Sequence, residues 1–121
     1  MAKIQMTITM PRGDIHPVNF VVNNIGEPNQ EIQLTEIYFT VKASFDEIRM
    51  LFQKRLSTGE IQLMDNGSYQ FVIMPEDTDR LKIGKYVFDI EVIGNNIKQT
   101  FIGEFVITEE VTYACNEQQN T

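Results

Sequence analysis

The sequence predicts an all-β protein, built as a sandwich of two packed sheets. Three observations support this prediction. Short apolar segments alternate at period two, turn residues such as Gly, Asn and Pro separate them, and β-branched and aromatic residues are frequent. The chain of 121 residues is long enough for one domain. We place that domain at residues 1–113, with about seven to eight strands, and expect a polar tail at residues 114–121.

The clearest pattern lies in residues 84–112, where two alternating segments predict a β-hairpin. A two-residue loop, either Gly94-Asn95 or Asn95-Asn96, would place aromatic side chains of both strands on one face, whereas a three-residue loop would turn those of the second strand outward. Gly103 would leave room beside one of the rings. The predicted core group of this hairpin is Tyr86, Phe88, Phe101 and Phe105.

The N-terminal residues predict two strands. The first alternates up to Pro11 and carries its apolar residues at Ile4, Met6, Ile8 and Met10. Arg12-Gly13-Asp14 then predicts a turn, since Gly suits turn geometry; the same tripeptide also occurs in integrin-type adhesion motifs, and we favour the turn. The second strand carries Val18, Phe20 and Val22, and the polar residues 23–33 predict a loop.

The middle of the chain contains one clear strand and one ambiguous segment. Residues 36–43 alternate and should point Ile37, Phe39 and Val41 inward. Residues 45–56 fit either a helix, begun by a capping box at Ser44 and Glu47, or a strand with an alternating apolar pattern. We favour a turn at residues 44–47 followed by a strand.

A second hairpin is predicted around Asp65-Asn66-Gly67. A three-residue loop with Gly67 in the left-handed conformation would pair Leu63 with Tyr69 and keep the apolar residues of both strands on one face. Residues 75–81 then predict one short helical turn. Its first position is Pro75, and acidic residues follow where they favour the helix N-terminus.

Composition limits the possible partners. The net charge of −7 argues against binding nucleic acid, which needs clustered Lys and Arg, and against electrostatic binding to an anionic membrane. Cys115 is the only cysteine, so no internal disulfide can form, and this agrees with synthesis in a reducing cytoplasm. The alternating N-terminus predicts a strand and not a signal peptide. No apolar run approaches the ~20 residues that span a bilayer.

The chain offers no complete catalytic or metal-binding set, so we expect no enzyme, no cofactor and no metal. His16 has no second histidine or cysteine pair to join it, and Cys115 has no basic neighbour that would lower its pKa. The acidic residues of segment 76–79 and of Asp65-Asn66-Gly67 lack the ligand number that calcium needs. A pair of carboxylates for sugar hydrolysis stays open, since their separation depends on the fold.

One segment resembles a known motif. A short helical turn followed by Gly84-Lys85-Tyr86-Val87-Phe88 resembles the tyrosine corner of immunoglobulin-like domains. The resemblance implies that the Tyr86 hydroxyl bonds to the upstream backbone and that Phe88 takes the core position of a cysteine. It therefore implies an immunoglobulin-like antiparallel β-sandwich.

Most of the chain, from about residue 8 to residue 112, resembles small virion β-sandwich proteins of bacteriophages of Gram-positive bacteria, and is similar to the N-terminal domain of baseplate upper proteins. The matching segments are Arg12-Gly13-Asp14, Leu34-Thr35, Phe39-Thr40-Val41-Lys42, Phe52-Gln53-Lys54, Asp65-Asn66-Gly67-Ser68-Tyr69, Pro75-Glu76-Asp77-Thr78, Gly84-Lys85-Tyr86-Val87-Phe88-Asp89-Ile90 and Gly103-Glu104-Phe105-Val106-Ile107.

This resemblance implies a non-enzymatic structural protein of the virion, in head or neck decoration or in the tail or baseplate. Its partners would be capsid, neck or tail proteins and further copies of itself, after synthesis in the bacterial host cytoplasm. The nearly uncharged first strand, with Ile4, Met6, Ile8 and Met10, predicts a subunit contact, which strand addition could provide. The alternative is a carbohydrate-binding or host-surface adhesion module that uses outward residues such as Tyr38 and Tyr113.

Overall fold

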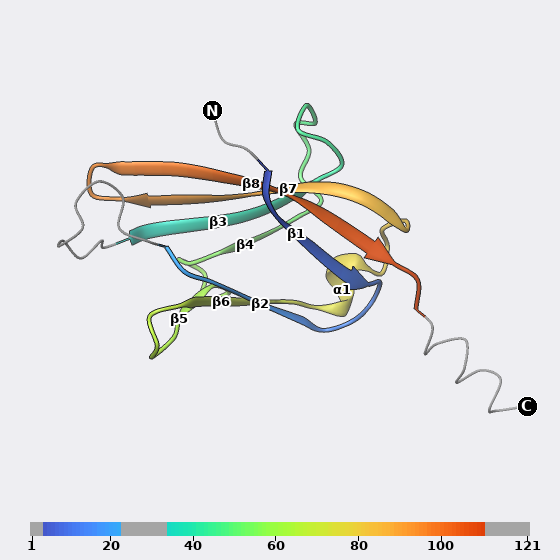
Figure 1. The fold of residues 1–121 in the computed structure, drawn as a ribbon, viewed down its shortest axis with the longest axis horizontal. Coiled ribbons are helices and arrows are strands. Elements are labelled where there is room, and N and C mark those ends of the chain that lie inside the picture. The colour runs from blue at the N-terminus through green and yellow to red at the C-terminus, as the bar shows by residue number, and fades with distance from the viewer. Residues whose placement is uncertain (1–3, 23–33, 111–121) are drawn as a thin grey trace, which may run out of the picture.

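The computed structural model describes residues 4–22 and 34–110, which form two packed β-sheets with one short helical turn (Figure 1). The predicted loop 23–33 and the predicted tail 114–121 lie outside the described residues. The elements are, in chain order, β1 (Ile4–Pro11), β2 (His16–Phe20), β3 (Leu34–Lys42), β4 (Phe52–Arg55), β5 (Gln62–Leu63), β6 (Tyr69–Ile73), α1 (Pro75–Thr78), β7 (Gly84–Gly94) and β8 (Ile97–Thr108).

The larger sheet has the strand order β1-β8-β7-β3-β4, and the smaller one has the order β2-β6-β5. This confirms the predicted all-β sandwich, and the last two strands share a sheet with β3 as in immunoglobulin-like domains. One pair departs from the expected antiparallel pattern, because β1 runs parallel to β8. These two strands come from opposite ends of the described chain and are not joined by a hairpin, so nothing requires them to be antiparallel.

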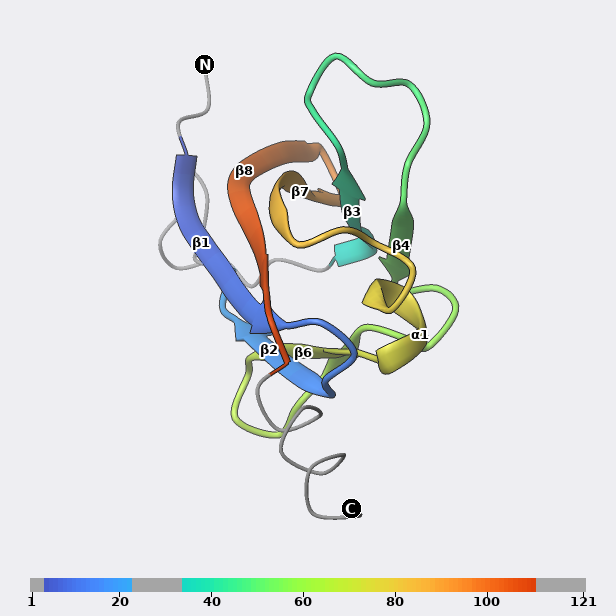
Figure 2. The ribbon, with the colours of Figure 1, turned by 90° about the vertical axis from the view of Figure 1, so that its right-hand side faces the viewer.

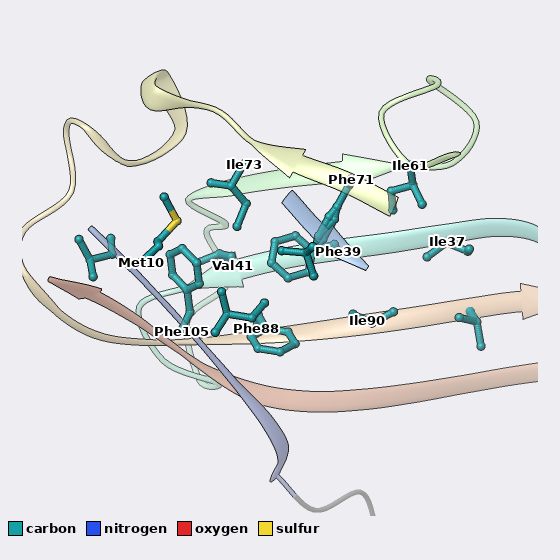
Figure 3. Packing of buried hydrophobic residues seen from close by; sticks show 14 residues of the cluster. Met10, Ile37, Phe39, Val41, Ile61, Phe71, Ile73, Phe88, Ile90 and Phe105 are labelled. Carbon is teal, nitrogen blue, oxygen red and sulfur yellow. The ribbon is translucent and has the colours of Figure 1, made fainter. Parts of the chain in front are cut away.

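The core lies between the two sheets and is built from the inward positions of both (Figure 3). Phe39 is at its centre, with its ring centroid 4.3 Å from that of Phe71 in the smaller sheet and 5.3 Å from that of Phe88 in its own sheet. As predicted, Ile37, Phe39 and Val41 all point inward, and none is exposed. Period-two alternation therefore identified this face of β3 correctly.

The β7–β8 hairpin has the predicted two-residue loop, and the alternative that forms is Asn95-Asn96. Gly94 pairs with Ile97, and Asn96 adopts a left-handed conformation with φ of 61°. The pairing sets Phe88 directly opposite Gly103. A Cβ atom on Gly103 would lie 2.4 Å from Cζ of Phe88, so only glycine fits beside this ring.

The ambiguous segment 45–56 forms a strand only near its end. Residues 43–51 have no regular structure, and β4 begins only at Phe52. The helical alternative is therefore wrong, because β4 pairs with β3 and takes its hydrogen bonds from the sheet. The favoured turn-then-strand interpretation is confirmed, although the strand is short.

The second hairpin and the helical turn also form. Leu63 pairs with Tyr69, and Gly67 has φ of 87°, as the three-residue loop requires. Leu63 itself is nevertheless 61% exposed, because β5 is a two-residue strand at the sheet edge. The helical turn α1 is shorter than predicted and ends at Thr78, with Pro75 at its start.

Candidate functional site

The outward face of the larger sheet contains a groove of about 430 Å³. Its floor is formed by side chains that alternate with the core residues of β3 and β7, and β4 adds one wall. In the register of the sheet, Tyr38 lies opposite Glu91 and Thr40 lies opposite Asp89. The polar residues that line the groove are Tyr38, Thr40, Lys42, Gln53, Asp89 and Glu91.

An apolar lip stands beside this groove. It consists of Phe45, Ile48 and Met50 in the connection between β3 and β4, which projects from the body of the domain (Figure 2). Ile48 is 96% exposed, and the other two side chains are each 50% exposed. The base of the connection is closed by a 2.7 Å hydrogen bond from the Leu51 amide to the Val41 carbonyl, so the lip projects from a fixed point.

The floor of the groove carries more negative than positive charge. Burial raises the pKa of the Asp89 carboxyl, the neighbouring Glu91 raises it further, and Lys42 opposes the shift. Glu91 has one distant ion-pair partner, Lys98, whose Nζ lies 3.9 Å from its Oε2. Lys42 is therefore the cation that lies within the groove lining itself.

The β4 side of the groove is held by a hydrogen bond from Gln53 and by the guanidinium of Arg55, which lies over Tyr38. The Gln53 side-chain amide donates to the Thr40 hydroxyl at 3.0 Å. The Arg55 guanidinium lies 5.0 Å from the centroid of the Tyr38 ring, and its Nη2 is 3.5 Å from Oε2 of Glu36. One side of the Tyr38 ring is thus already occupied.

Glu36 holds the Arg55 guanidinium in place through an ion pair. Burial raises the pKa of its carboxyl, but hydrogen bonds from Ser57 and Ile37 and the charge of Arg55 outweigh burial and lower the pKa overall. The amides of Ser57 and Ile37 each donate to Oε1 at 3.0 Å. Glu36 is therefore a fixed anion that orients Arg55 over Tyr38.

The predicted core group of the hairpin is structural. The Tyr86 hydroxyl donates a 2.6 Å hydrogen bond to the Lys82 carbonyl, which is the bond that defines a tyrosine corner. Phe88 and Phe105 are buried, and Phe101 packs against the core at its margin. These side chains hold the sandwich together and do not face the groove.

The predicted subunit contact on β1 needs a correction for two of its side chains. Ile8 and Met10 are buried in the domain's own core. The side chains of β1 alternate between the two faces of the sheet, and the exposed ones are those of Thr7 and Thr9. Met6 also packs against the core, and the side chain of Ile4 lies outside the description. Within the described residues β1 hydrogen-bonds only to β8, so strand addition through its backbone stays a prediction.

Arg12-Gly13-Asp14 forms a turn between β1 and β2, and its first two residues are tied to the domain. The Arg12 Nε lies 2.9 Å from Oε1 of Glu110, and the Gly13 amide donates to the buried Thr78 hydroxyl at 2.8 Å. Gly13 has φ of 79°, which explains the glycine. Arg12 is thus engaged within the domain, which favours the turn interpretation over adhesion.

Residues 4–22 and 34–110 contain no group of three or more His, Cys, Asp or Glu side chains that could hold a metal ion. Asp77, one of the acids weighed for calcium, instead lies 2.6 Å from Nζ of Lys54. His16 begins β2, and Cys115 and Tyr113 lie outside the described residues. The helix of this part of the chain is too short to cross a membrane.

The sequence did not predict the groove, although its alternating pattern placed Tyr38 on an outward face. The alternating pattern shows which residues of β3 and of β7 point outward. It does not show that these two strands are neighbours in the sheet, so the pairing of Thr40 with Asp89 could not be predicted. The signal for the apolar lip was present in Phe45, Ile48 and Met50. The apolar residues of segment 45–56 were used only to decide between a helix and a strand, and their exposure was not considered.

Comparisons with known proteins show the fold alone. No protein-family model matches the chain, and no curated protein matches it. Among solved structures, the chain is similar to part of an endo-beta-1,4-mannanase from Thermotoga petrophila, with a TM-score of 0.56 and 13% sequence identity. The match covers 88% of this chain and 18% of that one, so this chain spans less than a fifth of that protein.

Proposed function

We propose that this protein is a non-enzymatic structural component of a bacteriophage virion that acts through protein–protein contacts. The observation that carries the proposal is the apolar lip, where three large side chains stand exposed on one projecting connection. Exposed apolar side chains gathered beside a polar groove are typical of interaction sites. The phage-type sequence motifs supply the virion context, and capsid, neck or tail proteins are the proposed partners.

The chemistry of the groove favours binding over catalysis. Its lining contains no histidine or cysteine, the residues that most often form a nucleophile–base pair. Its two carboxylates, Asp89 and Glu91, come from the same face of one strand. A hydrolytic pair would need one carboxyl group as the proton donor and the other as the base or nucleophile. We assign both instead to charge recognition, because the lip beside them is apolar and exposed.

The test is incorporation into particles. We expect mass spectrometry of gradient-purified phage particles to detect the wild-type chain. Ile48→Asp should fold, as judged by circular dichroism, yet be lost from particles, because a charge would replace the most exposed lip residue. Ile15→Asp is the matched control, since Ile15 is 63% exposed in the turn between β1 and β2. A wild-type chain absent from particles, or Ile48→Asp retained at the wild-type level, would contradict the proposal.

A homo-oligomer in the particle is part of this proposal, with the β1 backbone as its contact. Thr7 and Thr9 are exposed on this strand. In a Cys115→Ser background, Thr9→Cys should form disulfide-linked dimers in assembled particles if two β1 edges pair. Thr58→Cys, at an exposed position between β4 and β5, should not. Equal cross-linking at both positions would remove this part of the proposal.

A second candidate function is carbohydrate binding or host-surface adhesion. The observation in its favour is Tyr38, an aromatic ring in a groove that Gln53 and Asp89 also line, which is a usual combination for holding a sugar. The fold neighbour is named as an enzyme that acts on a polysaccharide. Glycan-array binding that disappears in Tyr38→Ala would favour this function, and an array without signal would favour the structural role.

A further inference from the structure

We infer that the groove and the apolar lip bind an extended peptide segment of a partner protein, in which a lysine or arginine stands two residues from a large apolar residue. This inference rests on the proposed protein–protein function and specifies the chemistry of the partner. It follows from the charge, the shape and the apolar rim of one surface, the outward face of β3 and β7 together with the β3–β4 connection.

The first step is charge complementarity. Two carboxylates, Asp89 and Glu91, and one ammonium group, Lys42, line the groove, so its lining carries net negative charge. Lys98, which does not line the groove, offsets Glu91 only weakly, because its Nζ lies 3.9 Å from Oε2 of Glu91 on a largely exposed side chain. Asp89 is partly withdrawn from water, and its neighbour Glu91 makes its ionised form less favourable still. A cation placed over these two residues would offset both effects. Lysine and arginine are the side chains that carry such a charge.

The second step is shape. A smaller hollow of about 60 Å³ lies on the same face, lined by Thr40, Lys42, Phe45, Val87, Phe88 and Asp89. Thr40, Lys42 and Asp89 line both hollows, so the two adjoin each other on the sheet. Side chains two residues apart in an extended peptide point to the same face, so they could enter the two hollows, with the cation in the larger one and an apolar side chain against Phe45 and Val87.

The third step is the apolar rim. Ile48 and Met50 line the larger hollow and Phe45 lines the smaller one, so the lip borders both. These side chains are at least half exposed in the free domain. An apolar residue in the partner would cover them, which adds affinity without a further charge.

Charge also argues against two other occupants. A second copy of this chain, docked by the same surface, would bring two acidic floors together in a protein of net charge −7. A nucleic-acid strand would place phosphates over Asp89 and Glu91, and its backbone needs the opposite charge.

The test is selection from a library of random linear peptides with the full-length chain as bait. Enriched peptides should share a lysine or arginine two residues from Leu, Ile, Met or Phe, and binding should weaken as salt rises. The double variant Asp89→Asn/Glu91→Gln should bind the best peptide at least about tenfold more weakly. Glu104→Gln is the matched control, because Glu104 is an outward carboxylate on β8 that does not line the groove.

A second variant separates the lip from the floor. Ile48→Ser should weaken binding of the same peptide several-fold and should leave the salt dependence of binding unchanged. The inference would be overturned by a selection that yields no binder, by enriched peptides without an excess of cations, or by equal binding in the double variant. These outcomes differ from a failure of the virion proposal, because peptide binding does not depend on whether the chain is found in particles.

Discussion

The two faces of β3 and β7 are made by the same backbone and serve opposite purposes. Inward positions hold Ile37, Phe39 and Phe88, none of which is more than 1% exposed. Outward positions one residue away hold Tyr38 and Asp89, which line a groove. The inward face tolerates little change because every side chain there has close-packed neighbours. The outward face is only partly filled, so its residues can be chosen for binding at some cost in stability.

The largest expected effect comes from emptying the inward face. Phe88→Ala should lower the free energy of unfolding by about 3–5 kcal/mol, because it leaves a cavity beside Phe39 and Gly103. Urea denaturation followed by circular dichroism measures this. Val87→Ala, one residue along and facing outward, is the control and should cost much less. Similar losses for the two variants would remove the distinction between the faces.

The next prediction concerns a charge on the inward side. Lys54 is buried on β4, and its Nζ lies 2.6 Å from Oδ2 of Asp77 in α1. Lys54→Met should cost about 3 kcal/mol, since it leaves a largely buried carboxylate without its cationic partner, with only the Met74 amide still donating to it. The double variant Lys54→Met/Asp77→Asn should recover part of that loss because the remaining amide is neutral. A single variant as stable as wild type would mean that the pair contributes nothing to folding.

Adding one methyl group tests the closeness of packing. Gly103→Ala should cost about 1–3 kcal/mol. The new Cβ would lie 2.4 Å from the Phe88 ring and 2.6 Å from the Met6 carbonyl oxygen, and the backbone atom cannot move aside as a side chain can. Thermal unfolding is the measurement. In the double variant Gly103→Ala/Phe88→Leu, relief of the ring contact should restore only part of the loss, because the Met6 contact remains.

The tyrosine corner should give a smaller effect. Tyr86→Phe removes the hydrogen bond to the Lys82 carbonyl, which is 2.6 Å long but lies at an exposed site. Water can replace a partner there, so we expect a loss of about 1 kcal/mol. Chemical denaturation measures it, and Tyr38→Phe on the outward face is the control. No change in Tyr86→Phe would show that the corner bond does not stabilise this domain.

The inward face was largely predictable from the sequence, and the groove was not. Parity along one strand and loop length fix which residues of a hairpin point inward, so the aromatic face of the β7–β8 hairpin, with Gly103 beside a ring, follows from local pattern alone. The groove depends on β7 lying beside β3, and these two strands are far apart in sequence. The inward position of Lys54 was not predicted either. Alternation along β4 places this side chain inward, but a charged side chain is not expected in a core. Its partner Asp77 lies in α1, in the connection between β6 and β7, and the sequence does not show that the two meet.

The last prediction has the opposite sign and touches the outward face itself. Because the pKa of Asp89 is raised in the folded state, the native protein binds its proton more readily than the unfolded chain does. Between the ordinary aspartate pKa and the raised value, stability therefore falls as the pH rises, and the loss persists at neutral pH. Asp89→Asn should raise the melting temperature at neutral pH and should lose this advantage below the ordinary aspartate pKa. Melting curves at both pH values, with Glu104→Gln as the control, measure the difference. If Asp89→Asn were less stable than wild type at neutral pH, the Asp89 carboxylate would be making a stabilising contact within the domain. The residues of the groove floor would then contribute to folding, and we would no longer regard them as free to bind a partner.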